Sequence, residues 1–114
     1  GKIINMSSVR GLQGRANDPA YPATKGAVNL LTKSLAIEWA QKGITVNAIA
    51  PGYVDTDMVR AVPENVLEKI VSRIPVGRLG RAEDIARAVG FLVADDADFI
   101  TGATLSVNGG QHMY

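Results

Sequence analysis

Hydrophobic positions follow two different spacings along this chain, and they predict strands that alternate with helices. Short segments rich in apolar and β-branched residues occupy residues 2–6, 45–50 and 103–107, with Asn5 as a polar interruption of the first. Such segments have the length and composition of strands. The first ends at Ser7 and Ser8, and the second ends at Pro51 and Gly52. The near-continuous apolar run at 45–50 is typical of a parallel strand covered on both faces.

A long helix is predicted between the first two strands. Asp18 is expected to cap it, Pro19 suits its first position, and Gly43 suits the turn that ends it after about residue 42. Within this segment, apolar residues recur at helical spacing: Ala23, Ala27, Leu30, Leu31, Leu35 and Ala36.

The rest of the chain is predicted to hold two shorter amphipathic helices, at residues 63–72 and 82–94. Residues 53–62 and 74–81 are predicted to be a loop and a connector rich in Gly and Pro. A strand, a long helix and a strand in succession predict a right-handed βαβ unit. We therefore expect an α/β fold with three parallel strands and helices on both faces of the sheet.

Composition narrows the class of protein. The chain has 114 residues, 46% of them hydrophobic, which suits one globular domain or part of one. Twelve basic and eleven acidic residues leave a net charge of +1, with no charged block that would favour a nucleic acid or an anionic membrane as partner. No apolar run reaches about 18 residues, so a soluble cytoplasmic protein is expected.

A metal centre is not expected. The chain has no cysteine and its single histidine, His112, lies near the end, where a packing role is favoured. Asp95, Asp96 and Asp98 form an acidic cluster, but it lacks the glycine and the glutamate of a calcium loop, and a solvated turn is favoured there.

The candidate chemistry centres on Tyr21 and Lys25, which lie one helical turn apart on the same face of the predicted long helix. An ammonium group near a phenol favours the phenolate form, so such a tyrosine can exchange a proton with an alcohol or carbonyl oxygen. Ser8 follows the first strand, and its hydroxyl is expected to hold the same substrate oxygen. Since ligands of open parallel sheets bind beyond the carboxyl ends of the strands, Ser8 and Gly52 are expected to lie at this site.

An isolated Tyr-x-x-x-Lys pair is more often a solvated helix face, and the order of the surrounding motifs is what favours a functional site. An apolar strand ends in Ser7-Ser8, Tyr21 follows thirteen residues after Ser8, and a later strand ends in Pro51-Gly52.

In these motifs the chain resembles the short-chain dehydrogenase/reductase family over nearly its whole length. The residues that carry the resemblance are Ile3-Ile4-Asn5-Met6-Ser7-Ser8, Tyr21-x-x-x-Lys25, Val46-Asn47-x-x-x-Pro51-Gly52-x-x-x-Thr56 and Thr101-Gly102-x-x-x-x-Val107-Asn108-Gly109-Gly110. The resemblance implies that the chain is the C-terminal, catalytic half of a Rossmann-like doubly wound domain. The glycine-rich phosphate turn that would bind the cofactor pyrophosphate is not in this sequence.

The resemblance also implies roles for individual residues. Tyr21 would be the general acid/base, Ser8 would position the substrate oxygen, and Lys25 would bind the nicotinamide ribose and favour the phenolate. Residues 51–56 resemble the loop on the nicotinamide side, where Pro51, Gly52, the Val54 backbone and the Thr56 hydroxyl would contact the cofactor, NADP or NAD. Tyr53 is expected to line the substrate pocket.

Among members of the family, the chain most resembles reductases of 3-oxoacyl thioesters, which include acetoacetyl-CoA reductases. Polyol or sugar-acid dehydrogenases are an alternative, favoured by Ile37-Glu38-Trp39-Ala40. A non-catalytic fragment or interaction module is a third reading, in which case the isolated chain is inactive. A homo-oligomer is expected, because a half-sheet leaves the edge of its first strand unpaired and recruits partners there.

Overall fold

The computed structural model describes residues 1–113, which build a single sheet of three parallel strands. The strands are β1 (Lys2–Met6), β2 (Thr45–Pro51) and β3 (Thr104–Val107), in the spatial order β1-β2-β3. β2 is the central strand, and its residues from Thr45 to Ala50 are all buried, as expected for a continuous apolar run.

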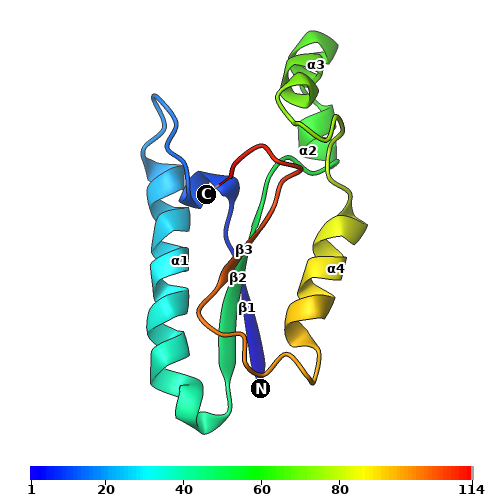
Figure 1. The fold of residues 1–114 in the computed structure, drawn as a ribbon. Helices are drawn as coiled ribbons and strands as arrows, with labels where there is room; N and C mark the ends of the chain where they lie inside the picture. The colour runs from blue at the N-terminus through cyan, green and yellow to red at the C-terminus, as the bar shows by residue number, and fades with distance from the viewer. Residues whose placement is uncertain (114) are drawn as a thin grey trace.

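Helices cover both faces of this sheet (Figure 1). On one face lies α1 (Ala20–Trp39), extended by the short helix η2 (Ala40–Lys42), and on the other lies α4 (Ala82–Val93). The short η1 (Val9–Gly11) follows β1, whereas α2 (Asp57–Arg60) and α3 (Glu64–Ser72) project beyond the end of β2. The predicted α/β fold is therefore confirmed.

The strand register brings the candidate residues to one edge of the sheet. Met6 pairs with Ile49, and Pro51 pairs with Val107. The carboxyl ends of β1 and β2 therefore lie side by side, with Ser8 just beyond the first and Gly52 just beyond the second.

The apolar core lies between the sheet and α4. Ile49, Ala88 and Leu92 are its buried centre, and six partly buried hydrophobic side chains pack around them: Ile4, Ile85, Val89, Ile100, Leu105 and Val107. Burial of each large side chain of this kind contributes about 1.5–3 kcal/mol, so this interface is what holds α4 on the sheet.

The opposite interface, between α1 and the sheet, is unexpectedly polar. The buried residues of α1 are Asn29, Thr32 and Ala36, whereas Leu30 and Leu31 are exposed. Buried polar groups need hydrogen-bond partners, and Thr32 Oγ1 accepts a bond of 3.0 Å from Asn5 Nδ2. Of the apolar residues at helical spacing in this segment, Ala36 is buried and Leu35 is partly buried, whereas the others are exposed.

Two of the motifs singled out in the sequence hold each other in place. The fully buried Asn47 donates to Ile100 O and accepts from Ala103 N, both at 3.0 Å. Thr101 Oγ1 accepts from Val46 N at 3.0 Å, and Gly102 N donates to Val46 O at 2.7 Å. These bonds fix the segment before β3 against the start of β2.

Two local predictions need correction. The N-cap of α1 is Pro19, one residue later than predicted, and the Asp18 carboxylate pairs with Arg15 while also interacting with the Tyr21 backbone N–H. Residues 53–62 are not entirely a loop, because Thr56 caps the four-residue helix α2 by accepting a hydrogen bond from Val59 N. A helix of one turn is too short for hydrophobic spacing to reveal.

At the start of α4, Asp84 accepts hydrogen bonds from Arg78 Nη1 at 2.9 Å and from Arg81 N at 2.8 Å. The Arg78 guanidinium, followed by the Arg81 amide, lowers the pKa of Asp84 from 3.8 to about 2. A carboxyl whose pKa is lower in the folded state stabilises it above pH 3.8, and this contribution is lost as the pH falls toward about 2.

We therefore expect Asp84→Asn to lower the urea midpoint of unfolding near neutral pH, because the amide cannot replace the charged bonds. The difference from the wild type should shrink as the pH falls below 3.8. Asp96→Asn, at an exposed carboxylate outside the three ion pairs of residues 1–113, is the matched control. A difference that stays constant with pH would contradict this role of Asp84.

Among the described residues, none of the helices has the length and apolar character needed to span a bilayer.

Candidate active site

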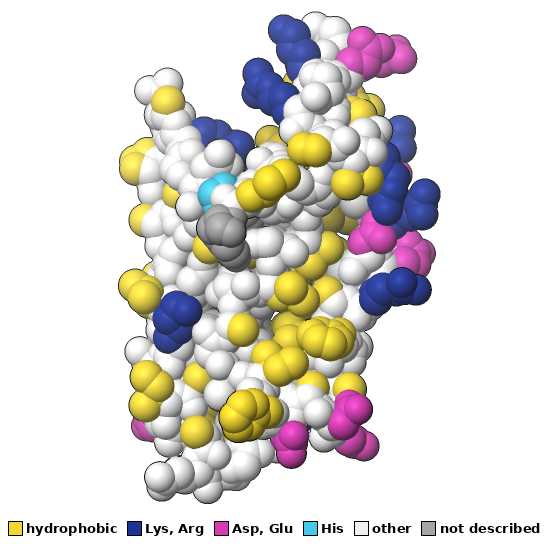
Figure 2. Space-filling model, in the orientation of Figure 1, with side chains coloured by type: hydrophobic (Ala, Val, Ile, Leu, Met, Phe, Trp, Pro, Cys, Tyr) yellow, Lys and Arg dark blue, Asp and Glu magenta, His cyan; other side chains and the backbone are white. Residues whose placement is uncertain are grey.

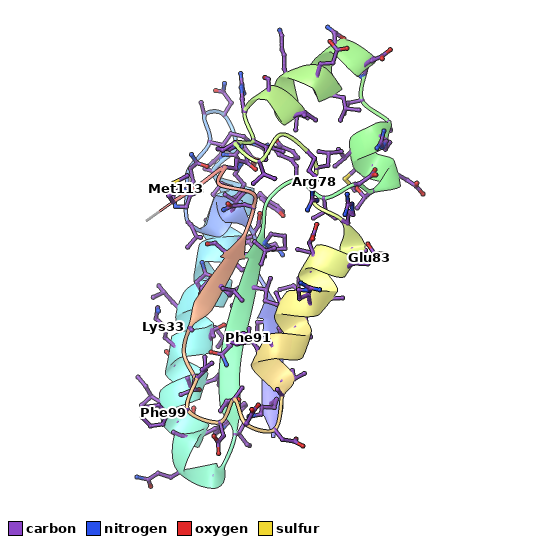
Figure 3. All side chains as sticks on the ribbon, turned by 45° about the vertical axis from the view of Figure 1, so that its right-hand side comes forward. Lys33, Arg78, Glu83, Phe91, Phe99 and Met113 are labelled. Atoms are coloured by element: carbon purple, nitrogen blue, oxygen red, sulfur yellow. The ribbon has the colours of Figure 1, made fainter. Side chains whose placement is uncertain are left out.

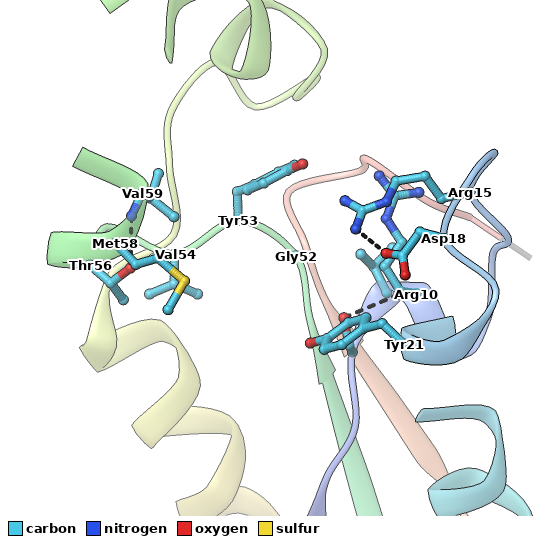
Figure 4. Close-up of a pocket in the computed structure, with 12 residues that line it drawn as sticks. Arg10, Arg15, Asp18, Tyr21, Gly52, Tyr53, Val54, Thr56, Met58 and Val59 are labelled. Atoms are coloured by element: carbon cyan, nitrogen blue, oxygen red, sulfur yellow. Dashed lines mark hydrogen bonds and ion pairs between the residues drawn. The ribbon is translucent and has the colours of Figure 1, made fainter. Parts of the chain in front are cut away.

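A cavity of about 460 Å³ lies at the carboxyl ends of the strands, where the sequence places the candidate site (Figure 4). Ser8, Tyr21, Gly52, Tyr53, Val54 and Thr56 all line it. Its wall also includes Arg15 and Asp18, together with four residues that sequence analysis did not single out: Val9, Arg10, Met58 and Val59.

Ser8 sits at the N-cap of η1, with its backbone extended. Its Oγ accepts a hydrogen bond of 3.1 Å from Arg10 N. A hydroxyl that accepts a bond from the backbone still has its own proton to donate. Ser8 can therefore donate a hydrogen bond to an oxygen that enters the cavity.

Tyr21 and Lys25 lie one turn apart near the start of α1, and Lys25 Nζ is 5.8 Å from the centre of the Tyr21 ring. The ring is 46% exposed, and its hydroxyl points toward the segment that carries Val54 and Met58 (Figure 4). Lys25 Nζ donates to Met6 O at 3.3 Å. This bond uses one of the three N–H groups of the ammonium and leaves the others for a ligand.

Three residues behind the cavity join the loop of Ser8 to the helix of Tyr21. Ser7 Oγ donates to Lys25 O at 3.2 Å, and Asn29 Nδ2 donates to Gly11 O at 3.2 Å. A Cβ atom on Gly11 would lie 2.8 Å from Ser7 Oγ and 2.9 Å from both Asn29 Nδ2 and the Lys25 carbonyl carbon. The close approach of η1 to α1 therefore requires glycine at position 11.

The segment after β2 forms the facing wall. Val54 forms an isolated parallel bridge with Gly80, in which Gly80 N donates to Tyr53 O and Asp55 N donates to Gly80 O. In a parallel bridge of this kind the backbone groups of the central residue point away from the partner. The N–H and C=O of Val54 are therefore not used by the bridge.

Thr56 and Gly52 complete this wall. Thr56 Oγ1 accepts from Val59 N at 3.3 Å, so its hydroxyl proton remains available to an acceptor. Gly52 N donates to Val107 O, and a Cβ on Gly52 would lie 2.7 Å from Asn108 Cβ. Glycine at this position lets the turn after β2 pack against the turn after β3.

Charges around the cavity are partly neutralised. Arg15 pairs with Asp18 at its rim and lowers the pKa of this carboxyl. Beyond Thr56, Arg60 binds Asp55 through two nitrogens, at 2.6 Å and 3.0 Å, and likewise lowers the Asp55 pKa.

The other titratable candidates lie elsewhere. His112 is half-buried in the turn after β3, where its carbonyl oxygen accepts a bond of 3.1 Å from Asn108 Nδ2. Within residues 1–113, no group of three or more His, Cys, Asp or Glu side chains is arranged to hold a metal ion.

Comparison with known proteins shows the family of this chain. A family model described as enoyl-(acyl carrier protein) reductase matches residues 1–112. An acetoacetyl-CoA reductase of Rhizobium meliloti is 58% identical to this chain. The match covers 99% of the chain and 47% of that protein. A 3-oxoacyl-(acyl-carrier-protein) reductase FabG of Pseudomonas aeruginosa is 50% identical to this chain. That match covers 99% of the chain and 46% of FabG.

The chain therefore belongs to the short-chain dehydrogenase/reductase family. It spans about half the length of the curated relatives it matches.

Proposed function

We propose that this chain is the catalytic half of an NAD(P)-dependent oxidoreductase that reduces a 3-oxoacyl thioester to the 3-hydroxyacyl form. The observation that carries the proposal is that Ser8 and Tyr21 line one cavity, with Lys25 beside the tyrosine ring. The names of the relatives, acetoacetyl-CoA reductase and 3-oxoacyl-(acyl-carrier-protein) reductase, support the substrate class.

In this reaction the chain supplies a proton and holds the oxygen that receives it. The Ser8 hydroxyl donates a hydrogen bond to the 3-oxo oxygen and fixes its position. The Tyr21 hydroxyl transfers its proton to the same oxygen, and the Lys25 ammonium stabilises the phenolate that remains. When bound, the reduced nicotinamide supplies the hydride to the carbonyl carbon, so one hydride and one proton complete the alcohol.

The residues of the cavity fit a nicotinamide cofactor. Lys25 has N–H groups available for the ribose hydroxyls, beyond the bond to Met6. The Val54 N–H and C=O, which the bridge to Gly80 does not use, match the acceptor and donor of a carboxamide. The Thr56 hydroxyl can donate to a phosphate, and the resemblance slightly favours NADP over NAD.

The decisive experiment is a reductase assay on a protein that contains this chain and has the length of the relatives. Oxidation of NADPH and NADH is followed with acetoacetyl-CoA, and the reverse reaction is followed with polyols and sugar acids. We expect turnover with the thioester. Turnover with sugar acids or polyols alone would favour the alternative dehydrogenase, and no turnover with any of them would favour an interaction module.

We further propose that the protein is a homo-oligomer. Leu30 and Ile37, seven residues apart on one face of α1, are 67% and 81% exposed, and Phe99 is fully exposed. Figure 2 shows hydrophobic side chains along the α1 edge and over the lower part of this face. Large apolar side chains exposed in this way, including Phe99, which is labelled in Figure 3, are typical of an interface.

We expect sedimentation velocity of the 114-residue chain to show a dimer or larger assembly, because the edge strand β1 and the exposed apolar residues both gain from burial. The double variant Leu30→Gln and Ile37→Gln should shift the distribution toward the monomer. A single monomeric species that also melts cooperatively above about 60 °C would refute the proposal.

A further inference from the structure

A second cavity, of about 270 Å³, lies next to the candidate active site. Its lining is Arg10, Gln13, Tyr53, Ile70, Arg73 and Gln111. Arg10 and Tyr53 line both this cavity and the larger one that holds Ser8 and Tyr21. A ligand long enough to extend past the Tyr53 ring therefore passes from one cavity into the other.

The lining of the second cavity carries positive charge that nothing in it offsets. It includes two arginines and no acidic residue. The ion pairs among residues 1–113 join Arg15 to Asp18, Arg60 to Asp55 and Arg78 to Asp84, so Arg10 and Arg73 take no part in them. Figure 2 shows Lys and Arg side chains on the α3 side of the hollow between α3 and the loop after η1.

The charges of α3 are separated between two sides of the helix. Helical geometry places Glu64 and Glu68 together, and places Ile70 and Arg73 on the side away from them. Because Ile70 and Arg73 line the cavity, the glutamates lie on the far side, as the magenta side chains at the outer edge of Figure 2 show. The basic side of α3 is therefore the one that faces the site.

Two amide side chains supply further hydrogen-bonding groups. Gln13 Oε1 accepts a long contact of 3.5 Å from Arg10 Nη1, which leaves the Gln13 amide hydrogens available as donors. Gln111 Oε1 is buried and accepts no hydrogen bond within the described part of the chain. An unpaired acceptor does not bind an oxyanion, so the anion-binding donors of this cavity are the two arginines and the Gln13 amide.

We propose that this second cavity is a subsite for an oxyanion carried by the substrate, a phosphate or a carboxylate, held by Arg73 and Arg10 at a distance from the reacting carbonyl. Guanidinium groups bind both anions through paired N–H donors. The inference rests on the proposed reductase function and adds to it that the substrate is anionic. A CoA thioester carries the phosphate, and a sugar acid carries the carboxylate.

The test uses a protein that contains this chain and has the length of the relatives. Its three substrates are acetoacetyl-CoA, the uncharged thioester acetoacetyl-N-acetylcysteamine, and a sugar acid. We expect Arg73→Gln to lower kcat/KM by about 10- to 100-fold for an anionic substrate, as for the loss of a charged hydrogen bond. The change should lie in KM, because the contact is remote from the reacting carbon. Loss with the CoA thioester identifies the phosphate, and loss with the sugar acid identifies the carboxylate.

Lys69→Gln is the matched control. It removes the same charge one helical turn before Arg73, but Lys69, unlike Arg73, does not line the cavity. We expect it to change kcat/KM by less than about 3-fold, because a charge that does not contact the bound anion is screened by water and salt. An equal loss in Arg73→Gln for the charged and uncharged thioesters would overturn the subsite, as would equal losses in the two variants.

A binding measurement separates failure of the subsite from failure of the proposed reaction. With saturating NADP and constant ionic strength, inorganic phosphate should raise the melting temperature of the wild type, because a ligand of the folded state stabilises it. The rise in melting temperature should be smaller in Arg73→Gln than in the wild type, and in Lys69→Gln it should equal the wild-type rise. An equal rise in the wild type and Arg73→Gln would overturn the subsite whatever the assay shows.

Discussion

Replacing Tyr21 by phenylalanine is expected to lower kcat by about 10²–10⁴-fold, the usual cost of losing a general acid, in an enzyme that contains this chain and has the length of its relatives. The substitution removes only the hydroxyl that points into the candidate site. The ring is half-exposed, and no hydrogen bond described for residues 1–113 uses the hydroxyl, so the fold should be unaffected. Steady-state kinetics with a 3-oxoacyl thioester measure the effect.

Tyr53→Phe is the matched control, because Tyr53 lines the same cavity and loses the same atom. Its kcat should fall by less than about 10-fold, since it has no proposed part in proton transfer. Near wild-type turnover in Tyr21→Phe, or an equal loss in the two variants, would remove Tyr21 from the role of proton donor.

The second large effect is expected from Gly11→Ala. The added methyl group would lie 2.8 Å from Ser7 Oγ and 2.9 Å from the Lys25 carbonyl carbon, and a backbone atom cannot move aside cheaply. Overpacking of this kind costs about 1–3 kcal/mol of stability. Relief of the clash separates η1 from α1, and Ser8 then moves relative to Tyr21. A displacement of about 1 Å at a reacting group can cost about 10²-fold in rate.

Gly14→Ala provides the control for Gly11→Ala. It adds the same methyl group to the same loop, where nothing lies within 4 Å. We expect a change of stability within about 0.5 kcal/mol and an unchanged kcat. Denaturant unfolding and steady-state kinetics of both variants decide the matter. If Gly11→Ala keeps the wild-type kcat, the contact between the loop and the helix does not position Ser8.

The strands could be predicted because each is a short segment rich in apolar and β-branched residues that ends in polar or Gly/Pro residues. The buried face of α1 could not be predicted from spacing. Asn29 and Thr32 are buried because their partners, Gly11 and Asn5, lie 18 and 27 residues away in the sequence. Local periodicity contains no information on such partners. The prediction that Leu30 and Leu31 lie on the buried face of α1 was therefore wrong.

The residues of the candidate site also fall into two groups, those that local sequence could predict and those that it could not. Tyr21 and Lys25 are related by a spacing within one helix and Ser8 follows the end of a strand, so the order and spacing of these motifs were enough to propose the three residues. Arg10, Met58 and Arg73 reach the cavities only through the path of the loops and of α3. The position of Arg10, two residues after Ser8, is a local signal that could have pointed to it.

The bridge between Val54 and Gly80 has a consequence for the engineering of this domain. Gly80 N donates to Tyr53 O at 2.9 Å, and Asp55 N donates to Gly80 O at 2.8 Å. The two ends of the segment 55–79 therefore lie side by side. Doubling the length of such an excursion costs only about 0.6 kcal/mol of closure entropy. This segment carries Met58, Ile70 and Arg73 together with Thr56, the proposed contact to the cofactor phosphate, whereas the residues proposed for proton transfer lie outside it. Libraries of chimeras that replace residues 57–79 and keep Thr56 can therefore acquire new substrates while the proton-transfer residues stay as they are.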